Sequence, residues 1–340
     1  MTVAARLTGG LLLAVAAALA LALRAPLPTT VLGLVAFGVL HNALELRYVA
    51  GRFAGVLAGR FLALLVALVS GIVLCRVAAL VVGSPARYAE ILIGYAVLVA
   101  AVVRLPRWPR IAGLAVLALA ASASLWWPAY HFVVLAHLHN VVPLVFLWEW
   151  ARRLPAAAAR AGFRIVQVGW VLAVPALILA GVADAWTGRV APGVAAFAGE
   201  PDPARVLAVS APPSTVDSTM GVRFLVVFAF LQTMHYVVWV WFLPRYAPDA
   251  TAAFERRVPA LTGRRVWALG IAGGAVLAVL FVLDYAGGRS VYAALATYHA
   301  YLEFPVLLAL LLAPVRAAAP APAPAPASRD LGRLLSPQQR

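Results

Sequence analysis

Histidine is the residue type whose placement in this sequence most clearly indicates chemistry. All six histidines lie inside long apolar segments, although a polar side chain at membrane depth is costly and usually faces the protein interior or a cavity. They are His41, His131, His137, His139, His235 and His299. Because neutral imidazoles bind iron, copper, zinc and nickel, such a group inside a membrane protein predicts a metal site.

Five of these histidines fall at a similar depth in four of the apolar segments, the second, sixth, eighth and tenth along the chain. If consecutive segments alternate in direction, these four run the same way. Their histidines then lie roughly 8 to 13 residues from the N-terminal end of each helix. At 1.5 Å per residue, the depths of these histidines differ by at most about 8 Å. We expect His41, His235, His299 and one of His137 or His139 to bind the metal.

Two glutamates follow histidines at helical spacing. His41 and Glu45, and likewise His299 and Glu303, form H-x-x-x-E patterns, which place each pair on one face of a helix one turn apart. Each glutamate either binds the metal directly or accepts the N–H of a metal-binding imidazole. Glu45 and Glu303 are therefore the predicted catalytic carboxylates.

Only one of the two closely spaced histidines on the sixth segment is expected to bind the metal. His137 and His139 stand about 200° apart around a regular helix, so only one of them can face a small site. The other is a packing residue or holds a ligand in place. His131 lies near the outer end of the same segment and is predicted to reach the membrane interface. Amides that neighbour the histidines or share their helical faces are predicted to support the ligands by hydrogen bonds; they are Asn42, Asn140 and Gln232.

Membrane helices must position these residues. The 340-residue chain is 64% hydrophobic and only 11% charged, against about 25% charged in soluble domains. Runs near the roughly 20 apolar residues that cross a bilayer, bounded by Arg, Pro or Gly, predict about ten transmembrane helices. Their approximate ranges are 8–24, 29–47, 61–82, 88–103, 110–127, 129–151, 164–184, 222–243, 265–285 and 290–314. The predicted fold class is an all-α, polytopic integral membrane bundle.

The basic residues predict how this bundle is oriented. All 27 are arginines, and 20 of them fall in the N-terminal segment, in alternate loops and in the C-terminal tail. Cytoplasmic loops retain positive charge, so both termini are predicted to be cytoplasmic in a bacterial-type plasma membrane. The net charge of +15 is assigned to contact with an anionic lipid surface, and nucleic acid is not expected as a partner.

The chain is predicted to form one transmembrane domain over 1–314, with a long outer loop at about 185–221. The Ala/Pro-rich stretch 315–340 is predicted to be a disordered cytoplasmic tail. The first segment also has features of a cleavable secretory signal, although its length suits a span. Cys75 is the single cysteine, which excludes an internal disulfide and a cysteine-based metal cluster. Nucleotide-binding glycine loops and the HExxH and GxSxG motifs are absent from the sequence.

Three short stretches resemble one membrane enzyme family. F-G-V-L-H-N-A-L-E at 37–45 is similar to the F-G-L-P-H-G-A-L-D signature of the Brp/Blh-type bacterial membrane β-carotene dioxygenases. Y-H-A-Y-L-E-F-P at 298–305 resembles the final histidine and carboxylate of that family, and M-H-Y-V-V-W at 234–239 resembles its histidine-aromatic helix. The resemblance implies a multi-helix membrane enzyme that holds iron through histidines and cleaves a polyene with dioxygen to give retinal.

Together these features favour a membrane-embedded non-haem iron oxygenase. Its substrates would be dioxygen and an apolar lipid or polyene that arrives from the bilayer. One alternative is a haem-binding electron-transfer or gas-reactive protein in which the same histidines are axial ligands. A second is a proton- or metal-coupled transporter that uses Glu45, Glu303 and the histidines as a relay.

Overall fold

The computed structural model describes residues 3–188 and 203–312, and within these ranges every regular element is a helix. This confirms the all-α fold class. The helices, in chain order, are α1 (Val3–Arg24), α2 (Pro26–Arg52), α3 (Gly59–Val82), α4 (Ser84–Val102), α5 (Arg107–Trp126), α6 (Pro128–Val141), α7 (Pro143–Trp150), α8 (Ala157–Val168), α9 (Val174–Leu179), α10 (Pro203–Ser210), α11 (Thr219–Tyr236), α12 (Leu243–Tyr246), α13 (Pro248–Arg257), α14 (Gly263–Leu283) and α15 (Tyr285–Leu312).

Nine helical stretches of the described chain are long and apolar enough to cross a membrane. Six are the single helices α1 to α5 and α14. Three are composites that continue through more than one helix, namely Pro128–Arg153, Ala157–Leu179 and Thr219–Tyr246. These nine match the first nine predicted segments. The tenth predicted segment forms α15, a 28-residue helix that carries His299 and Glu303 and is not among the nine apolar ones.

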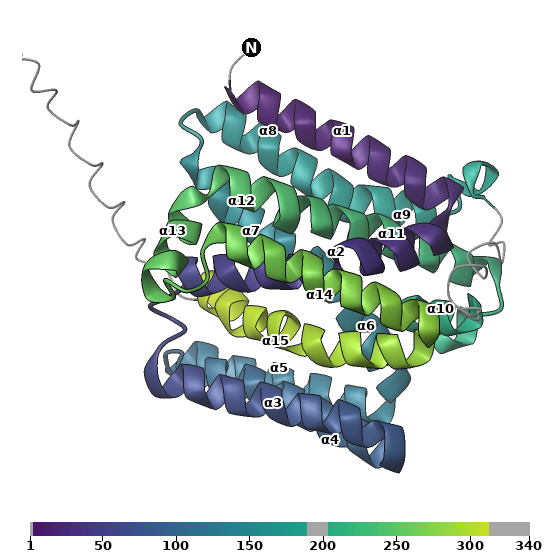
Figure 1. The fold of residues 1–340 in the computed structure, drawn as a ribbon, viewed down its shortest axis with the longest axis horizontal. Coiled ribbons are helices and arrows are strands. Elements are labelled where there is room, and N and C mark those ends of the chain that lie inside the picture. Colours follow the sequence, from purple (N-terminus) through teal and green to yellow (C-terminus); the bar gives the residue numbers. More distant parts are fainter. Residues whose placement is uncertain (1–2, 189–202, 313–340) are drawn as a thin grey trace, which may run out of the picture.

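The helices lie side by side in layers (Figure 1). α1 and α8 form one side of the bundle, and α3, α4 and α5 form a layer on the opposite side, with α2, α11 and α15 between them. The stretch Thr219–Tyr246, which begins with α11, is the most buried of the nine apolar stretches, whereas α5 has no buried residue. The central helices α2, α11 and α15 carry His41, His235 and His299, and the other three histidines lie on α6.

Two membrane stretches contain a π-helical turn shortly before a proline. The turns are Gly169–Ala173 and Val237–Phe242, and the prolines are Pro175 and Pro244. Proline has no N–H to bond the carbonyl four residues earlier, which loosens the hydrogen-bond ladder at that point. The second turn begins two residues after His235, so it changes the direction of side chains immediately beyond that histidine.

Residues between α9 and α11 are more structured than the predicted outer loop at about 185–221. The short helix α10 lies in this stretch and contacts α6 and α11, with Val206 and Ser210 buried. Residues 189–202 and the predicted tail at 315–340 lie outside the described residues, and the orientation of both termini stays a prediction.

Arginine–carboxylate pairs connect the helices at the end of the bundle where α2 ends. Arg52 of α2 bonds Glu149 of α7 at 2.5 Å, and Arg47 of α2 bonds Glu255 of α13 at 2.5 Å. Directly after α7, Arg153 makes two hydrogen bonds to Asp249 of α13, of 2.6 and 2.9 Å. We call these three pairs the arginine clasp.

Candidate metal centre

Four helices bring five metal-binding side chains to one point inside the bundle. They are His41 and Glu45 of α2, His139 of α6, His235 of α11 and His299 of α15. One potential ligand atom from each lies within 4.8 Å of those from all the others. Four of the side chains are almost completely buried, and that of His139 is 17% exposed. We call this group the histidine cluster.

The four imidazoles are arranged as a closed ring. His41 contacts His235 and His299, with ring centroids 5.1 and 4.9 Å apart. His139 contacts the same two rings, at 4.5 and 4.8 Å. Each histidine therefore has two histidine neighbours, and each comes from a different helix. The matched helical depths permit this convergence, and α2 and α15 are each continuous α-helices where they carry these histidines.

Two hydrogen bonds select the ring nitrogen that is available to a metal. The Nδ1 atom of His139 lies 2.7 Å from Oε1 of Glu303, and the Nδ1 atom of His41 lies 2.9 Å from the carbonyl oxygen of Phe37. A carbonyl or carboxylate oxygen only accepts, so both Nδ1 atoms carry the hydrogen in the neutral rings. The Nε2 atoms of His41 and His139 then present lone pairs, the arrangement found where imidazoles bind metals.

Several polar atoms of the cluster have no partner among the described residues, although Nε2 of His139 and Nε2 of His299 lie at the hydrogen-bonding distance of 3.1 Å. Nε2 of His235 is 3.5 Å from Oε2 of Glu45. Both oxygens of Glu45 and both ring nitrogens of His235 are buried without a hydrogen bond. Buried polar groups of this kind are strongly disfavoured unless something satisfies them. A cation bound by nitrogen and oxygen would satisfy them together, so the residues fit a metal ion.

The two predicted carboxylates occupy different places. Glu45 belongs to the group that converges on one point, whereas Glu303 holds the Nδ1 side of His139 from behind. Glu303 therefore orients a histidine, and Glu45 is the carboxylate that could bind the ion itself. The H-x-x-x-E spacing is the same in both helices and could not distinguish these two positions.

The structure resolves the choice between His137 and His139. His137 points away from the cluster: its Nε2 atom bonds the carbonyl oxygen of Ser210 at 2.7 Å, and its ring packs against Phe224 and Phe228. His137 therefore lies outside the group of potential ligands, to which His139 belongs. It fastens α6 to the end of α10, because a regular helix cannot turn both histidines to one side.

The three predicted supporting amides differ in what they contact. Gln232 donates from Nε2 to the hydroxyl oxygen of Tyr236 at 2.7 Å, and the ring of Tyr236 lies 4.6 Å from that of His41. Gln232 therefore acts on the cluster through Tyr236, an indirect contact that the sequence spacing did not reveal. Asn42 and Asn140 are buried, and Oδ1 of Asn42 has no hydrogen-bond partner in the described chain.

Aromatic side chains separate the cluster from the arginine clasp. Trp239 lies one helical turn beyond His235, with ring centroids 6.2 Å apart. Its ring packs on Tyr48 at 5.6 Å and on Phe146 at 5.2 Å, and all three are buried. This layer keeps the cluster in apolar surroundings on that side.

An intramembrane ion pair was not predicted from the sequence. Arg76 of α3 bonds Glu90 of α4 at 2.8 Å and donates to the carbonyl oxygen of Ala293 on α15 at 2.5 Å. Both charged residues lie inside predicted apolar segments, which was the available signal. The pair ties the outer layer to α15, the helix that carries His299 and Glu303.

No family model matches this chain, and neither a curated protein nor a solved structure matches it significantly. The class of protein is therefore defined by the fold and the site alone. They define a multi-pass helical membrane protein with a buried histidine and glutamate cluster that could hold a metal ion.

Proposed function

We propose that this protein is a membrane-embedded, non-haem iron dioxygenase that acts on an apolar polyene. The single observation that carries the proposal is the convergence of four histidines and Glu45 from four helices, with potential ligand atoms within 4.8 Å. Nitrogen and oxygen donors of this kind suit iron. The short stretches that resemble the Brp/Blh-type dioxygenases include three of these histidines, which supports iron and a polyene substrate.

Each residue of the cluster has a defined task in this proposal. His41, His139, His235 and His299 hold the ion. Glu303 keeps the Nδ1 hydrogen of His139 in place, and the carbonyl of Phe37 does the same for His41. Glu45 supplies a negative charge that offsets part of the charge of the ion. Iron bound here would supply the activation of dioxygen toward a carbon–carbon double bond.

The substrate site is proposed beside Tyr236. A cavity of about 520 Å³ lies between α2 and α11, and Phe37 and Tyr236 form its wall on the side of the cluster. Its other walls are mostly apolar, including Leu21, Leu32 and Trp241. A cavity of this size and lining suits an apolar molecule that arrives from the bilayer. The hydrogen bond from Gln232 holds the Tyr236 ring against His41.

The chemistry of dioxygen cleavage suits a site of this composition. When dioxygen cleaves one carbon–carbon double bond, one oxygen atom ends on each of the two new carbonyl groups. The reaction therefore balances without an external reductant. A site enclosed in apolar side chains excludes water, which protects reactive species.

The ring geometry favours a single ion over haem. In a bis-histidine haem the two imidazoles stand on opposite faces of the macrocycle, and no other side chain occupies the plane between them. In the histidine cluster each ring contacts two others at 4.5 to 5.1 Å, which leaves no slot for a macrocycle.

The first test is to purify the protein and measure metal content and visible absorption on the same sample. We expect near-stoichiometric iron, no Soret band, and dioxygen-dependent conversion of a carotenoid into carbonyl products. A Soret band would assign the histidines to haem. Folded protein that lacks metal and moves a solute into proteoliposomes without chemical change would replace the enzyme by a transporter.

A variant series tests the ligands one by one. His41→Ala, His235→Ala and His299→Ala should each lose bound metal while the protein still inserts and purifies as a monodisperse species. His137→Ala is the matched control, because that histidine lies on the same helix as His139 and contacts Ser210 instead of the cluster. Full metal occupancy in all three cluster variants would refute the site.

A further inference from the structure

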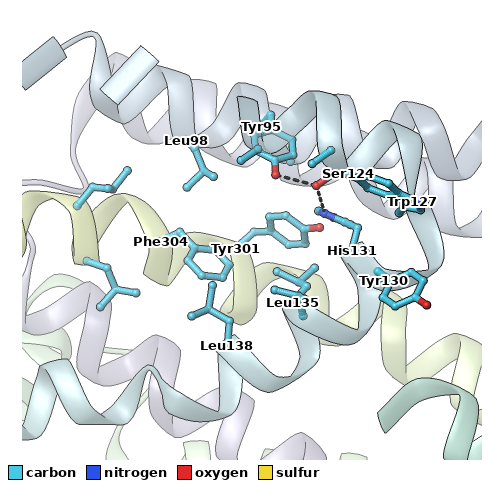
Figure 2. Close-up of a pocket in the computed structure, with 16 residues that line it drawn as sticks. Tyr95, Leu98, Ser124, Trp127, Tyr130, His131, Leu135, Leu138, Tyr301 and Phe304 are labelled. Carbon is cyan, nitrogen blue, oxygen red and sulfur yellow. Dashed lines mark hydrogen bonds between the residues drawn. The ribbon is translucent and has the colours of Figure 1, made fainter. Parts of the chain in front are cut away.

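A second cavity lies on the other side of α15 from the histidine cluster. Its volume is about 560 Å³, and it is bounded by α4, α5, α6 and α15 (Figure 2). Most of its wall is apolar, including Leu98, Leu135, Leu138 and Phe304. Neither the proposed metal chemistry nor the cavity beside Tyr236 uses this space.

Polar side chains gather at one end of this cavity. The hydroxyl groups of Tyr95 and Ser124 lie 2.8 Å apart, and Nδ1 of His131 lies 2.9 Å from the Ser124 oxygen. These contacts join α4, α5 and α6, and the chain of hydrogen bonds ends at the imidazole (Figure 2). His131 therefore does more than reach toward the membrane interface, as the sequence predicted.

Two polar groups at this end have hydrogen-bonding capacity that the described chain does not use. Nε2 of His131 is buried without a hydrogen bond, and the hydroxyl of Tyr301 lies beside Arg76, which can donate to its oxygen but cannot accept its hydrogen. Tyr301 is only 4% exposed, and its hydroxyl points toward His131 (Figure 2). Such groups at one end of an apolar cavity indicate a ligand with a polar end.

The hydrogen-bond chain indicates which polar group would fit. If Tyr95 donates to Ser124, and Ser124 donates to Nδ1 of His131, the hydrogen of the neutral imidazole sits on Nε2. Tyr301 also has a hydroxyl hydrogen to donate, since its charged neighbour Arg76 can only donate. Two donors then lie at the same end of the cavity. A carbonyl oxygen, which has two lone pairs and no hydrogen, satisfies both.

The position of the polar end matches the orientation of an amphiphile in a membrane. Trp127 and Tyr130 line the cavity near His131, at the turn between α5 and α6. Such aromatic residues favour the membrane interface. From there the cavity runs along the helices to Leu307 and Leu308. An apolar chain would lie at membrane depth while its oxygen sits near the surface.

We propose that this cavity binds an apolar molecule that ends in a carbonyl oxygen, held by His131 and Tyr301. Two sources carry that chemistry, a membrane quinone and a polyene aldehyde. The site does not rest on the proposed metal chemistry, because none of its lining residues belongs to the histidine cluster.

The test measures binding to the purified full-length protein by quenching of tryptophan fluorescence. The probes are all-trans-retinal, decylubiquinone, and a polyene hydrocarbon that matches retinal but lacks oxygen. The carbonyl probes should bind at least about tenfold more tightly than the hydrocarbon, the gain expected from roughly one hydrogen bond or more. The quenching that Trp127→Phe removes reports binding in this cavity, whereas the quenching that Trp241→Phe removes reports binding in the cavity beside Tyr236.

Two variants that preserve ring volume test the donors. His131→Phe and Tyr301→Phe should each weaken carbonyl binding about fivefold to tenfold and leave hydrocarbon binding unchanged. His137→Phe is the control on the same helix, and its affinity should match that of the unchanged protein. The tighter of the two carbonyl probes identifies the source. Equal binding of carbonyl and hydrocarbon, or unchanged affinity in both variants, would overturn the proposal. Binding should also survive treatment with a chelator, which separates this result from the fate of the metal proposal.

Discussion

The histidine cluster and the arginine clasp both include side chains of α2 and of the stretch Pro128–Arg153, but they use ionisable side chains in opposite ways. In the clasp, Glu149, Glu255 and Asp249 each accept a hydrogen bond from an arginine, so the charges neutralise one another. In the cluster, both oxygens of Glu45 lack a hydrogen bond and the imidazoles face one another. Each charge of the clasp is paired with an opposite charge within the chain, although Nε of Arg47, Nε of Arg52 and Oε2 of Glu149 are buried without a hydrogen bond. The cluster could instead be neutralised by a metal ion.

This difference distinguishes groups that hold the helices together from groups that bind a ligand. The clasp lies at the ends of the helices, where pairs join α2 to α7 and α13. The cluster lies within the bundle, where an unsatisfied polar group is most costly. Changes in the clasp should therefore affect stability, and changes in the cluster should affect metal binding.

Of the three tests, metal removal should produce the largest effect, a fall in thermal stability. A ligand that binds only the folded protein stabilises it by about 4 kcal/mol when it is present at about 1,000 times its dissociation constant. We therefore expect a chelator to lower the thermal midpoint by several degrees and iron to restore it. In Asp249→Asn the same shift should persist, because Asp249 is not in the cluster. An identical midpoint with and without iron would remove the contrast between the two regions.

Glu303→Gln should produce an intermediate effect on metal affinity. Loss of the carboxylate that orients His139 should weaken metal binding about 10- to 100-fold, the range typical for such supporting residues. Glu149→Gln, in the clasp, is the matched control and should retain full affinity. A competition titration with a chelator of known affinity measures both variants. Equal affinities in the two would show that Glu303 does not position a ligand.

Asp249→Asn should produce the smallest effect, a loss of thermal stability whose size depends on pH. Partial burial acts to raise the pKa of Asp249, but the hydrogen bonds from Arg153 outweigh it, so the pKa lies below its usual value. The pair therefore stabilises the folded state above the unfolded pKa of about 3.9, and the contribution disappears as pH falls through the lower folded value.

The Asp249 side chain is 51% exposed, so at neutral pH the contribution should be at most about 1 kcal/mol. Thermal midpoints of the two proteins, measured from pH 7 to pH 3, should converge at the acid end. Midpoints that diverge on acidification would show that Arg153 does not lower the pKa of Asp249.

Much of this architecture is readable in the sequence. Apolar length and arginine spacing predict the helices, and nine of the ten predicted segments coincide with apolar helical stretches. The tenth coincides with α15, the helix that carries His299 and Glu303. The count of residues from each helix end also places His41, His235 and His299 at one level. These features are local, since rise per residue and hydropathy follow from the chain itself.

The sequence by itself therefore determined the helices, their lengths and the depth at which each histidine lies. Tertiary structure alone decided how each helix is rotated about its axis and which helices are neighbours. Rotation of α6 brings His139 rather than His137 to the cluster, and the packing of α15 sets Glu303 behind a histidine while Glu45 of α2 faces the centre. Rotation depends on how all the helices fill space together, and no spacing within one helix records it.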